Sequence, residues 1–147
     1  MAIATDITRP DLSTHDKIVS EVANTRFDID GWQVVTENGH RNGSPDITAI
    51  SQDILVAVGE VETQETISDE RALKWKAWGD SCVRFYLYVP EGAEGEAIRL
   101  ISKHRIACAG LRSYSQNGKL EVNSVPMDNV HCKEDDHPWW VEIGSGD

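Results

Sequence analysis

The sequence has few cysteines, no long hydrophobic run and few basic residues, and each shortage excludes a class of protein. Three widely spaced cysteines in 147 residues do not form a disulfide framework, and they fit a reducing compartment. No apolar run approaches the roughly 18 residues that a membrane span needs, and residues 1–10 lack the basic start and apolar segment of a secretory signal. We therefore expect a cytoplasmic protein with no membrane partner.

The shortage of basic residues leaves a formal net charge of −11, which disfavours general binding of polyanions. Residues 121–147 hold seven acidic residues and one lysine, a net of −6, so residues 1–120 carry only −5. A nucleic-acid function would therefore have to rest on a local basic rim. The candidates for that rim are Arg41, Arg71, Lys74, Lys76 and Arg84.

What is present is the composition of a folded domain, with 39% hydrophobic and 27% charged residues. Because there is no internal repeat and no long linker, we expect one domain over 1–147, in which 126–147 form an acidic, tryptophan-containing C-terminal segment. Trp139 and Trp140 in that segment are interpreted as part of a last strand, a core flap or a dimer contact. A homodimer is thus one expected partner.

Hydrophobic periodicity predicts helices and strands in the order α-β-β-β-α-β-α-β-β. This order is typical of an α/β or mixed α+β fold with a central sheet, helices on its faces and a C-terminal β-hairpin. The second helix is expected to begin after Ser68 as its cap and to stop at Gly79. The continuously apolar run 54–58 predicts a central strand covered on both faces. The expected helices cover 13–26, 68–78 and a segment around 97–101, and the expected strands cover 32–35, 47–50, 54–58, 83–89 and a hairpin around 116–119.

Three acidic residues stand at the ends of two of these strands. Asp46 opens the strand 47–50, and Glu60 and Glu62 follow the apolar run. Strand side chains alternate, so Glu60 and Glu62 point to one face, and Asp46 lies beside Glu60 if the strands are antiparallel neighbours. Carboxylates gathered in this way favour a hard divalent cation, Mg²⁺ or Mn²⁺. The alternative is that the two glutamates are only the solvated end of a strand.

Pro45-Asp46, a strand, and then Val58-Gly59-Glu60-Val61-Glu62 resemble the motif of the PD-(D/E)XK nuclease superfamily. The likeness is to its small restriction-endonuclease-like and Holliday-junction-resolvase-like members, and it extends over roughly residues 13–106. It implies an α-β-β-β-α-β core with a mixed sheet. It also implies that Asp46 and Glu60 bind the metal, that Glu62 is the third catalytic residue, and that the substrate is nucleic acid, with DNA as the first expectation.

Glu62 departs from the family pattern, because most members have lysine at that position. Lysine would stabilise phosphoryl charge, whereas glutamate acts as a base or an added metal ligand. Lys74 or Lys76 on the following helix is a candidate replacement, and the alternative for both is an ordinary solvated lysine. Glu21 on the first helix is a candidate extra metal ligand, at a position that only flanks the buried face of that helix.

Other candidates are less specific. His40, Arg41 and Ser44 are interpreted either as phosphate contacts or as an ordinary turn. Trp75 and Trp78 either stack on bases or pack against the sheet, and packing is the expectation. One group of His131, Cys132 and His137 is a weak zinc signature because it lacks a second Cys/His pair.

The sequence alone supports three alternative functional hypotheses. The first is phosphodiester hydrolysis by metal-activated water at Asp46, Glu60 and Glu62. The second is a binding or assembly module that keeps the nuclease fold without turnover, which the Glu62 replacement and the net charge favour. The third is an α/β domain whose acidic strand ends have no role.

Overall fold

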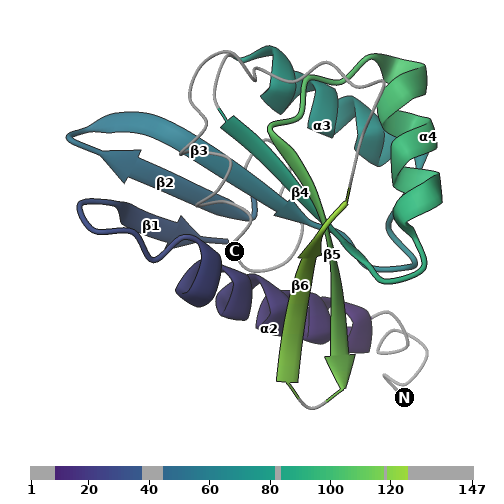
Figure 1. Cartoon of the computed structure of the whole chain (residues 1–147), viewed down its shortest axis with the longest axis horizontal. Coiled ribbons are helices and arrows are strands. Elements are labelled where there is room, and N and C mark those ends of the chain that lie inside the picture. The colour runs from purple at the N-terminus through teal and green to yellow at the C-terminus, as the bar shows by residue number, and fades with distance from the viewer. Residues whose placement is uncertain (1–8, 38–44, 82–83, 118, 126–147) are drawn as a thin grey trace.

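The structure is a computed structural model that describes residues 9–37, 45–81, 84–117 and 119–125 (Figure 1). The described elements follow the predicted order of helices and strands. No helix within these ranges combines the length and the hydropathy that crossing a bilayer requires. The elements are α2 (Arg9–Arg26), β1 (Gln33–Thr36), β2 (Ile47–Ser51), β3 (Ile54–Val61), α3 (Asp69–Asp80), β4 (Arg84–Pro90), α4 (Glu94–His104), β5 (Gly110–Asn117) and β6 (Lys119–Ser124).

The six strands form one mixed sheet in the order β1-β2-β3-β4-β5-β6. β1, β2 and β3 are antiparallel neighbours, β3, β4 and β5 are parallel, and β6 pairs antiparallel with β5. The parallel pairs need crossovers, and α3 and α4 supply them. The chain is thus an α/β protein, and the predicted C-terminal hairpin is confirmed in β5 and β6.

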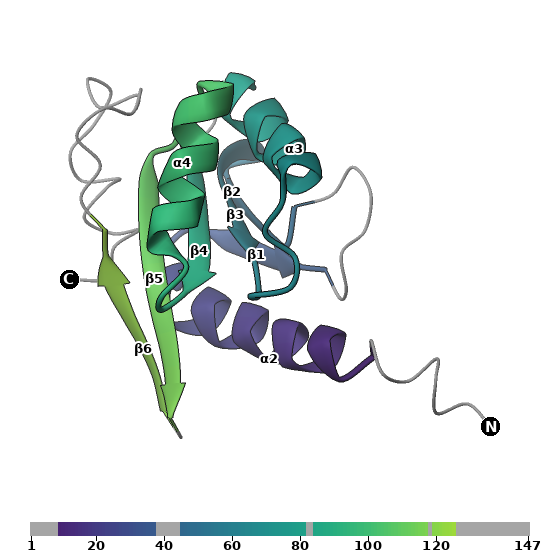
Figure 2. The ribbon, with the colours of Figure 1, turned by 90° about the vertical axis from the view of Figure 1, so that its right-hand side faces the viewer.

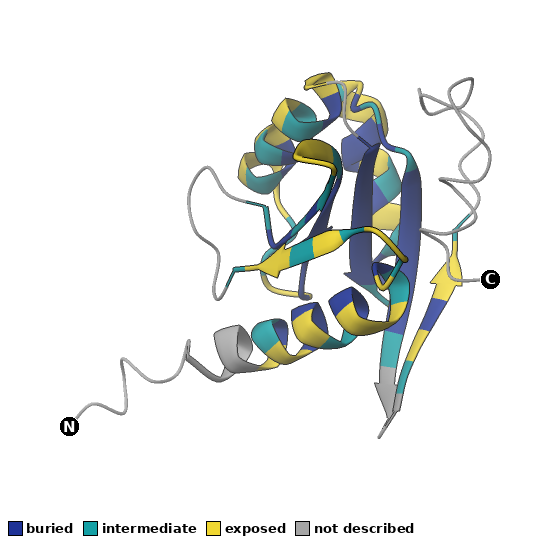
Figure 3. Cartoon of the chain, turned by 90° about the vertical axis from the view of Figure 1, so that its left-hand side faces the viewer, coloured by how far each residue is buried: buried dark blue, intermediate teal, exposed yellow. Residues whose placement is uncertain are grey.

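The helices bury the two faces of the sheet against two separate cores. On one face, α2 packs Ile18, Val19 and Val22 against side chains that include Ile47, Val61 and Tyr88. On the other face, α3 and α4 pack Trp75, Leu100 and Ile101 against Val58, Phe85 and Leu87. Figure 2 shows α3 and α4 next to each other and α2 apart from them. Burial is therefore greatest in the central strands, whereas β1 and β6 at the two edges show exposed residues (Figure 3).

The prediction that 54–58 is covered on both faces is wrong for the start of β3. Ile54 and Leu55 are 63% and 38% exposed, and complete burial begins only at Ala57. The reason is the β2–β3 hairpin, whose tip projects away from α3 and α4 (Figure 1). Gln52 and Asp53 form that tip with φ angles of 51° and 66°. Only the half of β3 that leads to Glu60 and Glu62 is a fully covered strand.

The start of α3 agrees with the sequence prediction and its end does not. Ser68 caps the helix, because its hydroxyl accepts the Arg71 N–H at 3.2 Å. Gly79 does not stop the helix, which continues to Asp80 and is capped by Ser81. Gly79 is instead a point of close approach, since a Cβ there would overlap the carbonyl oxygen of Ala107. The glycine is needed for packing and not for a turn.

Candidate functional site

Asp46 and Glu60 lie next to each other at the end of the antiparallel β2–β3 pair. The register joins Ile47 to Gly59, so one step further along the strands places Asp46 beside Glu60. Asp46 Oδ2 accepts the backbone N–H of Val61 at 2.8 Å. Both carboxylates are buried, at 1% and 0% exposure. Two acidic side chains thus lie side by side in a buried position, as the strand spacing predicts.

The proximity of the two carboxyl groups changes the pKa of Glu60. Burial, followed by the negative charge of Asp46, raises the pKa of Glu60 well above its ordinary value, and Lys74 opposes that rise. Its Oε2 accepts the indole N–H of Trp78 at 3.0 Å and lies 3.5 Å from Lys74 Nζ. Its Oε1 lies 3.5 Å from an Arg71 nitrogen but has no hydrogen-bond partner among the described residues. One buried carboxylate oxygen therefore retains bonding capacity.

Glu62 faces the same side of the sheet as Glu60. Its carboxylate accepts hydrogen bonds from side chains of α3 and of the loop that precedes α3. It accepts the Thr66 hydroxyl at 2.6 Å and the Trp75 indole N–H at 2.8 Å. Arg71 adds contacts at 3.0 Å and 3.1 Å to its Oε2. The backbone of Glu62 is held as well, since its N–H donates to Tyr88 and its carbonyl accepts the Tyr114 hydroxyl at 2.6 Å. Glu62 is thus an anchor between β3 and α3.

The helix α3 presents one polar face to these carboxylates. Arg71, Lys74, Trp75 and Trp78 recur at helical spacing, and each contacts Glu60 or Glu62. Lys74 is only 16% exposed because it turns toward Glu60. Lys76 lies elsewhere, 3.6 Å from Asp80 and 3.4 Å from the Arg105 carbonyl oxygen. Of the two candidate lysines, Lys74 is the one that the fold brings to the acidic pair.

His15 is a site residue that the sequence analysis missed. Its Nε2 lies 3.1 Å from Asp46 Oδ2, and its Nδ1 lies 3.0 Å from Asp16 Oδ1. Burial works against a charged imidazole, but the hydrogen bonds and charges of Asp46 and Asp16 outweigh it and raise the pKa of His15. Burial also favours a protonated Asp46, yet His15 lowers its pKa overall. The available signal was the position of His15, three residues before Ile18 on the buried stripe of α2.

Glu21, the other acidic candidate on α2, is placed away from this group. It lines a cavity with Arg26 and Leu120, toward β6. His15, and not Glu21, is the α2 residue that contacts Asp46. The predicted basic rim is likewise reduced: Arg71 and Lys74 reach the carboxylates, while Arg84 is buried in β4.

The described residues hold no group of three or more His, Cys, Asp and Glu arranged around a metal position. Asp46 and Glu60 form a pair, and Glu62 is taken up by Arg71 and Trp75. A pair is compatible with Mg²⁺, which keeps several waters and often binds one or two carboxylates together with substrate phosphates. The buried Glu60 Oε1 without a hydrogen bond is the feature of this pair that suits a cation.

Several sequence candidates fall outside the described residues. They are His40, Arg41, Ser44, His131, Cys132, His137, Trp139 and Trp140. Trp75 and Trp78 are described, and both pack against the sheet as expected; Trp75 is completely buried. Their indole N–H groups donate to Glu62 and Glu60. The two tryptophans therefore pack against the sheet and hydrogen-bond the two glutamates, Trp75 to Glu62 and Trp78 to Glu60.

Comparison of the chain with protein-family models, with curated proteins and with solved structures gave no match. We therefore infer function from the geometry of Asp46, Glu60 and their neighbours.

Proposed function

We propose that this protein is a metal-dependent nuclease whose Asp46 and Glu60 bind Mg²⁺ or Mn²⁺ and whose substrate is nucleic acid, DNA first. The observation that supports it is one juxtaposition: two buried carboxylates from antiparallel strands with Lys74 3.5 Å from the second. We further propose that α2, β1–β3, α3 and β4 correspond to a restriction-endonuclease-like core. The order of elements and the mixed sheet are compatible with that fold.

Each residue has a defined part in this proposal. Asp46 and Glu60 supply the carboxylate oxygens for the ion, and His15 orients Asp46 through its hydrogen bond. When bound, the ion supplies an activated water and neutralises charge on the phosphoryl group. Lys74 provides the positive charge that lysine supplies at the third signature position in most PD-(D/E)XK proteins.

In this proposal Glu62 has a structural role and takes no direct part in the chemistry. Its carboxylate fixes Arg71 and Trp75, so α3 is held at the distance at which Lys74 meets Glu60. This assignment removes the difficulty of a negative residue at the third signature position, because the positive charge comes from the helix. A substitution of Glu62 is therefore expected to affect folding, whereas a substitution of Glu60 is expected to affect turnover.

The net charge of −11 remains unfavourable for a polyanionic substrate, and the proposal must account for it. Among the described residues, the cations at the site are Arg71, Lys74 and, when protonated, His15. We therefore expect weak substrate binding that decreases steeply with salt, because the attraction depends on few phosphate contacts.

The test is a cleavage assay of the full chain on plasmid, branched and single-stranded DNA and on RNA, with Mg²⁺ or Mn²⁺. We expect the parent to cut at least one substrate and Asp46→Ala to lose that activity. Asp53→Asn, at the exposed hairpin tip, is the acidic control and should retain it, because asparagine tolerates the positive φ of that position. An inactive parent, or an Asp46→Ala variant as active as the parent, would refute the proposal.

A second candidate is a binding or assembly module that keeps this fold without turnover. The observation in its favour is that Arg71 and Lys74 already lie within 3.5 Å of Glu60, which compensates its charge without a metal. Calorimetric titration with Mn²⁺ discriminates the two candidates. Binding that disappears in Glu60→Gln supports the nuclease, and no binding to the parent supports the module.

A further inference from the structure

The edge strand β1 has backbone groups that the sheet does not use. β1 is the first strand of the sheet, and within the described ranges only β2 pairs with it. The Glu37 N–H donates to the Asp46 carbonyl, which makes Glu37 and Asp46 a hydrogen-bonded pair. Because such pairs alternate along antiparallel strands, the N–H and C=O of Val34 and Thr36 point away from β2. Four backbone groups are thus directed outward along this edge.

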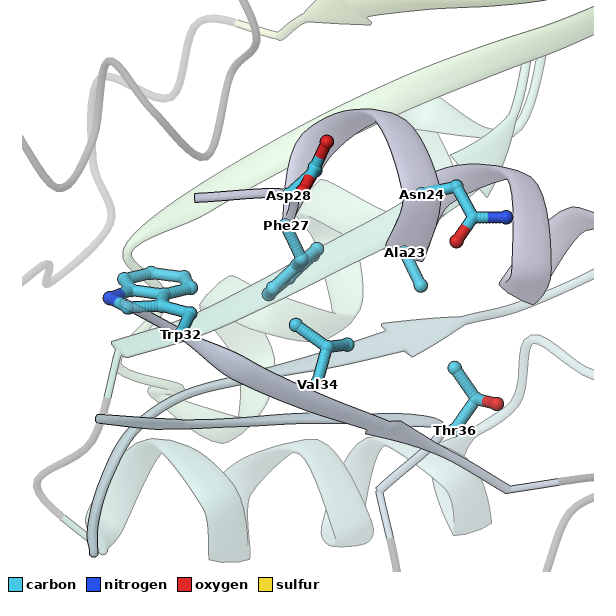
Figure 4. A pocket seen from close by; sticks show the side chains of 7 residues that line it. All are labelled: Ala23, Asn24, Phe27, Asp28, Trp32, Val34 and Thr36. Carbon is cyan, nitrogen blue, oxygen red and sulfur yellow. The ribbon is translucent and has the colours of Figure 1, made fainter. Parts of the chain in front are cut away.

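A groove lies beside the same edge. It has a volume of about 540 Å³ and separates β1 from the end of α2 (Figure 4). Val34 and Thr36 line its floor, while Ala23 and Phe27 line the opposite wall and Trp32 closes one end. The residues that line the floor are therefore the ones whose backbone points outward. An extended chain placed along β1 would direct every second side chain into this groove.

Within the described residues, β1 lacks the charged residues and the proline that usually protect an edge strand. Natural edge strands are commonly blocked by charged residues, by proline or by bulges. The β1 sequence Gln33–Thr36 contains no charge and no proline, and Val35 is 43% exposed on the opposite face. The other edge differs, since β6 carries the exposed charged residue Glu121. The two edge strands of the sheet thus differ in whether they carry charged residues.

The surroundings of the groove are acidic. Asp28 lines it, Asp30 precedes β1 and is exposed, and Glu37 follows β1. These charges disfavour a nucleic-acid backbone and favour a cationic occupant. They equally disfavour a second copy of a chain whose net charge is −11, and the acidic C-terminal segment. Charge therefore selects a basic partner among the extended chains that could fit.

We propose that β1 and this groove bind an extended, basic segment of a partner protein as a seventh strand of the sheet. The partner forms backbone hydrogen bonds with Val34 and Thr36, which supply affinity. Alternate small apolar side chains of the partner enter the groove between β1 and Phe27. A lysine or arginine of the partner pairs with Asp28. The proposal does not depend on the nuclease assignment, because it uses none of the carboxylates of that site.

The test measures binding of a fluorescent peptide, Lys-Thr-Val-Thr-Val-Thr-Lys, to the full chain by anisotropy, because its lysines and valines lie on the same face of an extended strand. The same peptide with N-methylated amides on alternate residues loses backbone donors, and we expect at least tenfold weaker binding. Thr36→Pro removes an outward N–H that β2 does not use, a position at which an edge strand tolerates proline. This variant should keep the circular dichroism spectrum of the parent and bind the peptide at least tenfold more weakly.

A charge exchange keeps the proposal testable if Thr36→Pro fails to fold. Asp28 is exposed, so Asp28→Lys should leave the fold intact. It should weaken binding of the lysine peptide two- to fivefold, as expected for an exposed ion pair, and strengthen binding of the corresponding glutamate peptide. Equal binding of both peptides to parent and variant would overturn the proposal.

Other occupants give distinct results, and each of them overturns the proposal. A single-stranded oligonucleotide that displaces the peptide would assign the groove to nucleic acid. Dimerisation of the parent in sedimentation, abolished by Thr36→Pro, would assign it to a second copy. A synthetic peptide of residues 137–145 that binds more tightly than the lysine peptide would assign it to the chain's own C-terminal segment.

Discussion

His15 Nε2 lies 3.1 Å from Asp46 Oδ2, and both side chains are 1% exposed. The contact joins the first helix to the strand end at which Asp46 meets Glu60. It gives Asp46 a partner that favours its charged form, while the adjacent Glu60 is driven toward its protonated form. The two neighbouring carboxyl groups are thus pushed apart in pKa, an arrangement that is common at functional sites.

The first prediction concerns this contact. His15→Ala removes a partner of the buried Asp46 oxygen and leaves its Val61 N–H contact, so we expect a loss of about 1–3 kcal/mol in the free energy of unfolding. We also expect Mn²⁺ affinity to fall by about 10- to 100-fold, as for other residues that orient a metal ligand. Urea unfolding and calorimetry measure the two effects. Glu21→Gln on the same helix is the control and should change neither; a loss of Mn²⁺ binding there would restore Glu21 as a ligand.

The second prediction concerns Lys74 and Lys76. Lys74→Ala should reduce the cleavage rate by about 10²–10³-fold, the usual effect of removing one charge-stabilising group. Lys76→Ala should cut like the parent, because Lys76 pairs with Asp80 away from the carboxylates. Single-turnover cleavage with saturating Mg²⁺ measures both. Equal rates for Lys74→Ala and Lys76→Ala would show that the lysine has no part in turnover.

The third prediction separates Glu62 from Glu60 by stability. Glu62→Ala leaves the Arg71 guanidinium without its main partner and removes the acceptor of the Trp75 indole. Breaking a buried ion pair on one side costs about 3–5 kcal/mol, so we expect a loss near the lower end of that range, since Arg71 is 18% exposed. Thermal and urea unfolding measure it. If Glu62→Ala were as stable as the parent yet inactive, Glu62 would belong to the chemistry and not to the support.

The fourth prediction is a pH dependence of the metal-free chain. The pKa of Glu60 and that of His15 are raised above their ordinary values of 4.5 and 6.5, so their contributions to stability are full below those values and lost as pH rises through the raised ones. The pKa of Asp46 is lowered, so its contribution is full above 3.8 and lost at lower pH. For these three groups together, stability should therefore be greatest between about pH 3.8 and 4.5, should decline above pH 4.5 through Glu60, and should decline further above pH 6.5 through His15.

Glu60→Gln provides the check on that pH dependence. A neutral amide avoids the cost of a buried charge, so the variant should melt above the parent at pH 8 and show a flatter pH profile. Since about 1 kcal/mol moves the melting temperature of a chain of this size by ~3 °C, the difference is measurable by calorimetry. A variant that loses stability at pH 8 would mean that Lys74 and Arg71 overcompensate the charge of Glu60.

The sequence predicted the order of the elements because periodicity and capping are local properties. The acidic pair was predictable for the same reason: strand alternation and one hairpin are enough to place Asp46 beside Glu60. Two things depend on tertiary contacts and could not be read locally. One is the role of His15, whose partner lies 31 positions away. The other is the division between Glu60 and Glu62, which depends on which side chains of α3 reach each carboxylate.

The last prediction tests the packing of α3 against the segment before β5. In most helix interiors Gly→Ala stabilises, because alanine has the higher helix propensity. At Gly79 the added Cβ would meet the carbonyl oxygen, carbon and nitrogen of Ala107, which are backbone atoms with little freedom to move. We therefore expect Gly79→Ala to destabilise the chain by about 1–3 kcal/mol, as overpacking does.

Ala77→Gly on the exposed side of α3 is the matched control for helix propensity, with an expected loss of about 1 kcal/mol. Both variants are compared with the parent by urea unfolding. Because the clash would displace α3 from the sheet, Gly79→Ala should also lengthen the separation of Lys74 and Glu60 and lower cleavage, whereas Ala77→Gly should not. A Gly79→Ala variant more stable than the parent would show that α3 does not approach Ala107 as closely as described.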